Sequence, residues 1–248
     1  AGGITANDLT FSTANYILQG GKITLNGTTP TITNAVTATI NSEIGGTAGL
    51  TKTGAGELIL GAANSYTGRT LVLGGALALP AAENLGPAPR TPVTQQLTLD
   101  GGALVIENSF DLPVTTGVAV GSASGKITVP VDLTLGIPGG IADRDALAGV
   151  LDLEGSGTVN FTGNSSYSGG GTFKGLTVNA NATNAFGTGA VMLDGTTVNC
   201  AGKPANTPSC VVVMTEVLPC ISCWARMILP PKAAPIAWWP RHTPRIGS

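Results

Sequence analysis

The sequence has few charged and few aromatic residues for its length. Of its 248 residues, 10% are charged and 4% are aromatic, whereas an ordinary globular domain carries about 25% charged residues. With a net charge of −2, a basic face for nucleic-acid binding is not expected. The scarcity of aromatic residues argues against a compact enzyme with a dense aromatic core. Disorder is excluded as well, because 42% of the residues are hydrophobic.

Cysteine and tryptophan are absent from residues 1–199, while residues 200–248 contain all four cysteines and all three tryptophans. The first segment holds 34 of the 36 glycines and has a net charge of −6, and the second holds 8 of the 16 prolines and has a net charge of +4. We therefore predict two segments, with a boundary near residue 199. The second segment, the tail, is either a cap on the fold or the product of a frameshift near residue 200. No uninterrupted apolar run reaches the roughly 18 residues of a membrane-spanning helix, and the N-terminus lacks the pattern of a signal peptide.

The first segment contains an internal repeat. Two stretches align without gaps at an offset of 101 residues, and a later pair of blocks follows them in the same order. The matching pairs are TGAGELIL at 53–60 with EGSGTVNF at 154–161, NSYTG at 64–68 with SSYSG at 165–169, and LTLDGG at 97–102 with VMLDGT at 191–196. Several ordered blocks at nearly one spacing indicate a repeat architecture. We predict two repeat units within residues 1–199, at about 49–106 and 150–199.

The residues shared by the two units are the candidate functional positions, and we expect their role to be structural. Glycine can adopt the backbone conformations of tight corners that are unfavourable for other residues. The tyrosines lie beside a Thr-Gly or Ser-Gly turn at the corner of the unit, although an aromatic ring can also stack on a sugar. The repeat positions are Gly54, Gly56, Tyr66, Gly68, Gly155, Gly157, Tyr167 and Gly169.

Short apolar alternations indicate strands with one buried face. Leu58 and Leu60 alternate with Ile59, and the same period of two recurs at 76–79 and 103–106. Glycine pairs or Asp-Gly pairs follow almost at once, and the segment 141–150 allows at most one short turn or helix. Short strands with small aliphatic residues favour stacked coils over a sandwich or barrel. The predicted fold class is all-β, a parallel β-helix with an irregular C-terminal tail.

The first repeat unit resembles the autotransporter-associated β-strand repeat found in passenger domains of bacterial type V autotransporters. The resemblance rests on GLTKTGAGELIL at 49–60, NSYTGRT at 64–70 and GGAL at 74–77, and it covers about residues 8–199. The second unit is more divergent, with Leu153 opposite Lys52. The resemblance implies a right-handed parallel β-helix that reaches the cell surface or the exterior through the outer membrane. It implies that the repeat assists passenger folding and outward transport, without catalysis or a cofactor.

The same resemblance implies a partner, because the family carries a C-terminal membrane β-barrel translocator. Residues 200–248 are too short and too rich in proline to form one. We therefore expect a translocator that is encoded elsewhere or a chain that is a fragment or a truncated product. The expected function is a structural stalk or adhesin-like passenger that contacts host-cell or bacterial surface glycans or proteins. A β-helical polysaccharide-degrading enzyme and a truncated or pseudogene product without activity remain the alternatives.

Few residues suggest chemistry, and we predict no catalytic, cofactor-binding or metal-binding residue. The acidic cluster Asp143-Arg144-Asp145 is the one arrangement comparable to a polysaccharide lyase site, and we expect it to be a solvated turn. Asp132, Asp152 and Glu154 could join it only if the coils stack them together. A Ser-His-Asp triad is not expected, because His242 is the single histidine. Cys220-x-x-Cys223 is half of a zinc spacing, but Cys200 and Cys210 do not complete it.

Overall fold

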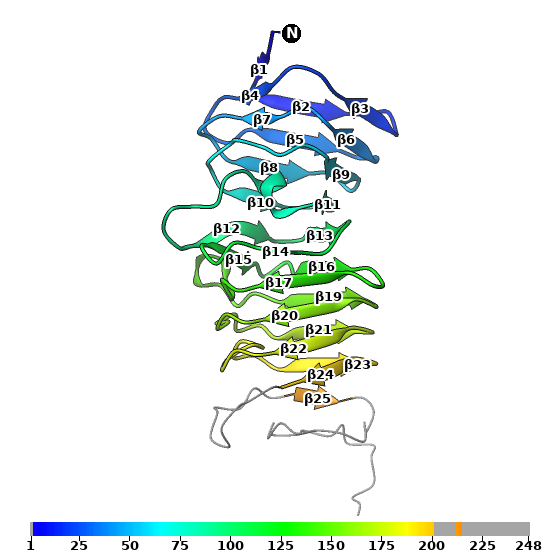
Figure 1. Cartoon of the computed structure of the whole chain (residues 1–248), viewed down its shortest axis with the longest axis vertical. Coiled ribbons are helices and arrows are strands. Elements are labelled where there is room, and N and C mark those ends of the chain that lie inside the picture. The colour runs from blue at the N-terminus through cyan, green and yellow to red at the C-terminus, as the bar shows by residue number, and fades with distance from the viewer. Residues whose placement is uncertain (1, 201–211, 215–248) are drawn as a thin grey trace, which may run out of the picture.

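The computed structural model describes residues 2–200 and 212–214. The chain winds into a stack of coils along one long axis, with the N-terminus at one end (Figure 1). Strands pair in parallel in each of the four sheets. The helical elements of the described residues are two short 3-10 turns, η1 at Ala82–Leu85 and η2 at Arg144–Ala146. The predicted all-β parallel β-helix is confirmed. None of the helices in this part of the chain is long and apolar enough to span a membrane.

Each coil contributes strands to up to three sides of the stack. The seven-stranded sheet contains β2 (Asp8–Phe11), β5 (Thr31–Asn34), β8 (Leu50–Thr53), β10 (Thr70–Val72), β12 (Val93–Leu99), β15 (Thr116–Val120) and β18 (Ile141–Asp143). The ten-stranded sheet contains β3 (Tyr16–Leu18), β6 (Ala38–Ile40), β9 (Glu57–Leu60), β11 (Ala76–Leu79), β13 (Ala103–Ile106), β16 (Gly125–Val129), β19 (Leu151–Gly155), β21 (Gly171–Lys174), β23 (Val191–Asp194) and β25 (Val212–Met214).

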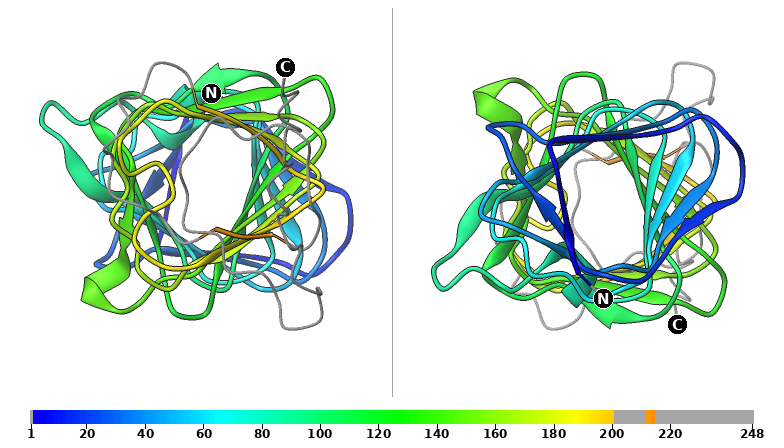
Figure 2. Two further views of the ribbon diagram at one scale, coloured as in Figure 1. Left: turned by 90° about the horizontal axis from the view of Figure 1, so that it is seen from below. Right: turned by 90° about the horizontal axis from the view of Figure 1, so that it is seen from above.

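The third side is built from two shorter sheets. The three-stranded sheet contains β1 (Ile4–Ala6), β4 (Ile23–Leu25) and β7 (Ile44–Gly45), and the five-stranded sheet contains β14 (Phe110–Asp111), β17 (Thr134–Ile137), β20 (Thr158–Phe161), β22 (Thr177–Ala180) and β24 (Thr197–Asn199). Seen along the axis, the coils overlap around a common centre (Figure 2). Strand β25 continues the ten-stranded sheet inside the predicted tail, while the proposed boundary near residue 199 stays a prediction.

The core consists of columns of like side chains stacked from coil to coil. In the ten-stranded sheet one inward column runs through Leu58, Leu77, Leu104, Ile127, Leu153, Phe173 and Leu193. All seven are at most 6% exposed, and complete burial of one aliphatic side chain stabilises a fold by about 1.5–3 kcal/mol. The predicted alternation holds here, because Ile59 lies outside between the buried Leu58 and Leu60. No coil could bury this column without its neighbours.

Irregular segments fill the third side between its two sheets. In the coils that follow β7, this side is formed first by residues 62–68 and then by η1, neither of which is a strand. Regular strand pairing on this side resumes only at β14. Main-chain hydrogen bonds still stack these segments: the Ser65 amide donates to the Ile44 carbonyl at 2.8 Å, and the Asn64 amide donates to the Glu83 carbonyl at 3.1 Å. The NSYTG block of the first repeat unit lies in this irregular part. Side-chain hydrogen bonds are therefore needed where strand pairing is missing.

Candidate functional site

The two repeat units place equivalent strands on different sides of the stack. In the first unit β8 belongs to the seven-stranded sheet and β9 to the ten-stranded sheet, while the equivalent β19 and β20 belong to the ten-stranded and five-stranded sheets. Over the offset of 101 residues the chain completes four coils and then passes along one more side of the stack. The second unit is thus turned by one side about the axis. The matching residues of the two units face different directions and do not form one contiguous site.

The six glycines of the predicted motif lie where one coil passes closely over the coil before it. A Cβ atom on any of them would come within 3.0 Å of main-chain atoms of that preceding coil. For Gly56 the nearest atom is the Val36 carbonyl oxygen, and for the equivalent Gly157 it is the Pro130 carbonyl oxygen. Gly54 also has a φ of 82°, a conformation that favours glycine. This close approach is a physical reason for the structural role that we predict for these positions.

Both tyrosines of the motif are completely buried. Tyr66 and Tyr167 are each 0% exposed, so neither ring is available to stack on a sugar. The Tyr66 hydroxyl lies 2.7 Å from the Thr70 Oγ1, and burial raises the pKa of Tyr66 far above its usual value, so the hydroxyl stays protonated. Gly171 occupies the position equivalent to Thr70, so this particular side-chain hydrogen bond cannot form in the second unit.

An asparagine pair holds the irregular segments of the first unit together. The Asn64 Oδ1 accepts a hydrogen bond from the Ile44 amide at 2.7 Å, and its Nδ2 donates to the Asn84 carbonyl at 2.6 Å. The Asn84 Nδ2 donates in turn to the Ala62 carbonyl at 2.7 Å. One amide side chain thus connects the coil below with the coil above. These groups are nearly or completely buried, and without such partners they would cost free energy.

The second unit makes only part of this connection. Ser165 stands at the position of Asn64, and its Oγ accepts a hydrogen bond from the Ile141 amide at 3.1 Å. A serine hydroxyl is too short to bridge two coils as an asparagine amide does. Asn64 belongs to the NSYTG block of the first unit, but it is not shared with the second unit, whereas the glycines and tyrosines are, so the repeat pattern did not select it.

Lys52 is the most unusual side chain of the first unit, because it is fully buried in the core. Its Nζ donates hydrogen bonds to three carbonyl oxygens, of Thr53 at 3.0 Å, Gly54 at 2.9 Å and Gly74 at 3.0 Å. Burial lowers the pKa of Lys52 to about 8. In the second unit Leu153 takes this place and is 1% exposed. The sequence could have indicated this burial, because Lys52 lies two residues after the inward-facing Leu50 and therefore on the same face of strand β8.

The acidic cluster at 143–145 is engaged in structural contacts. The Asp143 carboxylate accepts hydrogen bonds from the Gly149 amide, the Ser168 amide and the Ser168 hydroxyl at 2.7–2.9 Å. Burial acts to raise the pKa of Asp143, but these three hydrogen bonds together hold it below its usual value. Arg144 pairs with Asp100 at 2.5 Å. The segment forms the end of β18 and the short turn η2, as the sequence predicted.

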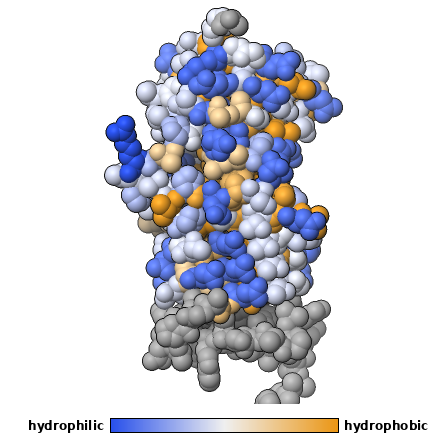
Figure 3. Space-filling view, viewed as in Figure 1, coloured by the Kyte–Doolittle hydropathy of each residue, from blue (hydrophilic) through white to orange (hydrophobic). Residues whose placement is uncertain are grey.

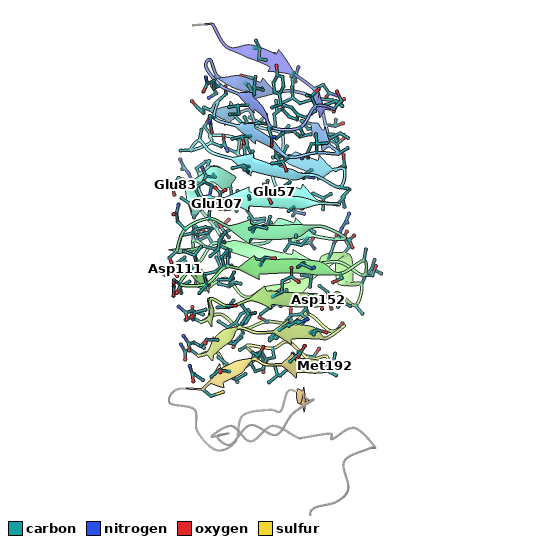
Figure 4. The ribbon with its side chains drawn as sticks, turned by 90° about the vertical axis from the view of Figure 1, so that its right-hand side faces the viewer. Glu57, Glu83, Glu107, Asp111, Asp152 and Met192 are labelled. Carbon is teal, nitrogen blue, oxygen red and sulfur yellow. The ribbon has the colours of Figure 1, made fainter. Side chains whose placement is uncertain are left out.

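The other acidic candidates do not gather into a site. Asp152 accepts hydrogen bonds from Ser124 and Thr172, and Glu154 pairs with Lys126 at 3.1 Å. The labelled carboxylates in Figure 4 are spread along the stack, from Glu57 to Asp152. Within residues 2–200 and 212–214, no three His, Cys, Asp or Glu side chains are arranged to hold a metal ion. Cys200 is disulfide-bonded, while His242 and the other three cysteines lie outside the described residues.

Comparisons with known proteins match the repeat and a long surrounding stretch. The family model described as the passenger-associated-transport-repeat matches residues 50–79 and 151–180, two stretches of equal length at the offset of 101. The curated protein "Adhesin BmaC autotransporter" of Brucella suis biovar 1 is 36% identical over 178 residues, which make up 68% of this chain and 5% of that protein. The chain thus spans about a twentieth of that relative. No solved structure is significantly similar. These matches confirm the resemblance that the sequence predicted.

Proposed function

We propose that this chain, which is a segment of an autotransporter passenger domain, serves as a stalk with an adhesive side at the bacterial cell surface. Such passengers leave the cell through the outer membrane, and the two matches support this location. An outer-membrane β-barrel translocator, either part of a longer chain or separately encoded, is the partner that the family implies. The matched relative is named an adhesin, and this supports a role in contact rather than in catalysis.

The observation that carries the adhesive role is a regular polar array on the five-stranded sheet. We call it the Thr-Asn array, and its members are Thr158, Asn160, Thr177, Asn179, Thr197 and Asn199. The threonines stack in one column and the asparagines in a second column beside it. Between the columns the valines of β20 and β22 are 0% exposed and point into the core. The array therefore lies on the outside and carries no charge.

Hydrogen bonds between neighbouring coils hold the asparagine column in register. The Asn179 Nδ2 donates to the Asn160 Oδ1 at 2.7 Å, and the Asn199 Nδ2 donates to the Asn179 Oδ1 at 2.9 Å. Parallel strands lie about 4.8 Å apart, so hydroxyl and amide groups recur at that interval. A repeating polar polymer such as a surface glycan can contact several coils at once. Weak single contacts then add up through multivalency. On the face shown in Figure 3, hydrophobic residues are scattered among hydrophilic and near-neutral ones.

Alanine substitutions in the array test the adhesive role. We expect Thr177→Ala combined with Asn179→Ala to reduce retention on beads that carry purified bacterial or host-cell glycans by about tenfold, since the loss of neighbouring contacts multiplies. The matched control is Thr39→Ala combined with Thr172→Ala, which removes outward threonines of the ten-stranded sheet. Equal retention of both double variants would contradict an adhesive array. Circular dichroism confirms that each variant is folded.

A further inference from the structure

One loop projects from the stack between η1 and β12 (Figure 1). It spans residues 86–92, with the sequence Gly-Pro-Ala-Pro-Arg-Thr-Pro. In the seven-stranded sheet Thr70 pairs with Leu50 on one side and with Leu97 on the other, so the coil that contains the loop is seven residues longer than the one before it. The extra length leaves the side of the stack, and the view along the axis shows the same excursion (Figure 2).

The backbone of residues 87–92 within this loop is free of main-chain pairing. Among the described residues, no main-chain amide or carbonyl of 87–92 forms a hydrogen bond with another main-chain group, and pairing resumes with the Val93 amide. Three of the six residues are prolines, which have no amide hydrogen and restrict the chain to extended conformations. An extended, unpaired and projecting segment is the form in which a protease binds its substrate backbone.

Arg90 is the exposed basic residue of this loop and differs from the other basic residues of the described part of the chain. It makes no ion pair there, whereas Lys22, Lys126 and Arg144 do, and Lys52 is buried. Lys174 belongs to strand β21. Arg69 is exposed too, but its carbonyl accepts the Leu50 amide at 2.8 Å and β10 begins at the next residue. Within residues 2–200, Arg90 alone combines an exposed basic side chain with an unpaired backbone.

We propose that the peptide bond between Arg90 and Thr91 is a processing site for a serine protease of the trypsin type, and that the cleaved stalk stays assembled. An acidic S1 pocket in such an enzyme binds the arginine side chain. Hydrolysis consumes one water molecule: the carbon–nitrogen bond breaks, Arg90 gains a carboxylate and Thr91 gains an amino group. The residue after the cleaved bond is threonine, so the nitrogen of the bond that is cut does not belong to a proline, and Pro92 follows one position later.

The cleaved chain holds together because strands from both fragments are paired. Strand β10 lies before the cut and pairs with β12 after it, and β11 pairs with β13 through four residue pairs from Ala76↔Ala103 to Leu79↔Ile106. Their inward side chains, Leu77 and Leu104 among them, are 0% exposed. Cleavage therefore removes one covalent bond at a loop tip and leaves the buried columns intact. The passenger can be processed while its adhesive side remains attached.

Limited digestion of the folded full chain with trypsin tests the site. Intact-mass analysis should identify Arg90–Thr91 as the first bond cut within residues 2–200. Arg90→Gln should slow the first cut in this range by more than about tenfold, because the other basic residues of this range are buried, ion-paired or part of a hydrogen-bonded main chain that must open first. The control Arg69→Gln should leave the rate at Arg90 unchanged. A first cut at another basic residue of this range, or no effect of Arg90→Gln, would overturn the proposal.

The second part of the proposal is tested on the cleaved protein. Fragment 1–90 and the fragment that begins at Thr91 should separate on a denaturing gel but elute together from a size-exclusion column without denaturant. The circular dichroism spectrum should not change after the cut. Elution of the two fragments as separate species would show that the stalk does not survive processing, and would overturn the claim that it stays assembled.

Discussion

The two repeat units share the same spacing of strands and glycine corners, but they bury different side chains. The first unit buries polar groups: Lys52 donates to three carbonyl oxygens, Asn64 bridges two coils and Tyr66 bonds Thr70. In the second unit the equivalent of Lys52 is Leu153, and the core becomes aromatic. Phe173 lies 6.4 Å from Phe161 and 5.6 Å from Phe186 between ring centroids. A coil corner can thus be closed by hydrogen bonds to main-chain oxygens or by the packing of large rings.

The difference shows which parts of the repeat the fold requires. The glycines recur in both units because a side chain at those corners would collide with the main chain of the coil before. The polar interior recurs only in part, because Leu153 replaces Lys52 and Ser165 keeps one of the two contacts of Asn64, so the full network is not needed to form coils. A buried hydrogen-bonded network favours one arrangement over others, since misaligned partners remain unsatisfied. The first unit therefore has groups that can fix the register of its coils, and the second relies on hydrophobic packing.

Exchanging the residues at 52 and 153 between the two units should have the largest effect on this comparison. Leu153→Lys places a charge between Ile127 and Phe173 of the core, and we expect it to lower the free energy of unfolding by about 4 kcal/mol. Lys52→Leu leaves carbonyl oxygens without their donor and should cost about 2 kcal/mol. Guanidinium unfolding curves measure both losses.

A conservative change provides the reference for this exchange. Leu153→Met keeps the volume and the apolar character of the side chain, so its cost should stay below about 1.5 kcal/mol. If Leu153→Lys costs no more than Lys52→Leu, the second unit can accommodate a buried amine as well as the first. In that case the two interiors are interchangeable, and the distinction between a polar and an apolar unit has no energetic basis.

The pH dependence of stability should differ between the units because only the first buries an amine. Burial lowers the pKa of Lys52 from 10.5 to about 8, so between these values the unfolded chain binds more protons than the folded chain. Stability contributed through Lys52 must then rise with pH in this window, by about 1–2 kcal/mol from pH 7.5 to 9.5. Unfolding midpoints at the two pH values, compared with those of Lys52→Leu, isolate the effect. A difference between the two proteins that does not change with pH would contradict it.

The fold could be predicted because each coil repeats the same simple pattern. Leu58 and Leu60 alternate with an outward residue, and parallel stacking places Leu58 beside Leu77 without any further information. Short strands bounded by glycine already exclude most other all-β architectures. The prediction that the tyrosines lie at coil corners needed only the repeat itself, and their complete burial removes the alternative of sugar stacking.

The relative orientation of the two units could not be predicted, because coil length varies. The coil from Leu50 to Thr70 is shorter than the coil from Thr70 to Leu97, since the latter contains the loop at 86–92. The offset of 101 residues therefore does not reveal how many coils separate the two units. The hydrogen-bond acceptors of Lys52 could not be predicted for a related reason. One of its acceptors, the Gly74 carbonyl, belongs to the next coil, and its position depends on the stacking.

The smallest expected effect concerns the hydrogen bond between Tyr66 and Thr70, which sharpens the contrast because Gly171 replaces the threonine in the second unit. Thr70 faces inward between Leu50 and Leu97 and is 1% exposed, so its hydroxyl depends on this partner. Tyr66→Phe should lower the free energy of unfolding by about 1 kcal/mol. Thr70→Val, which keeps the shape, should cost a similar amount. The double variant should cost clearly less than the sum, because the two hydroxyls serve one bond. Urea unfolding of the four proteins measures this coupling, and strictly additive costs would mean that the two hydroxyls stabilise the first unit independently of each other.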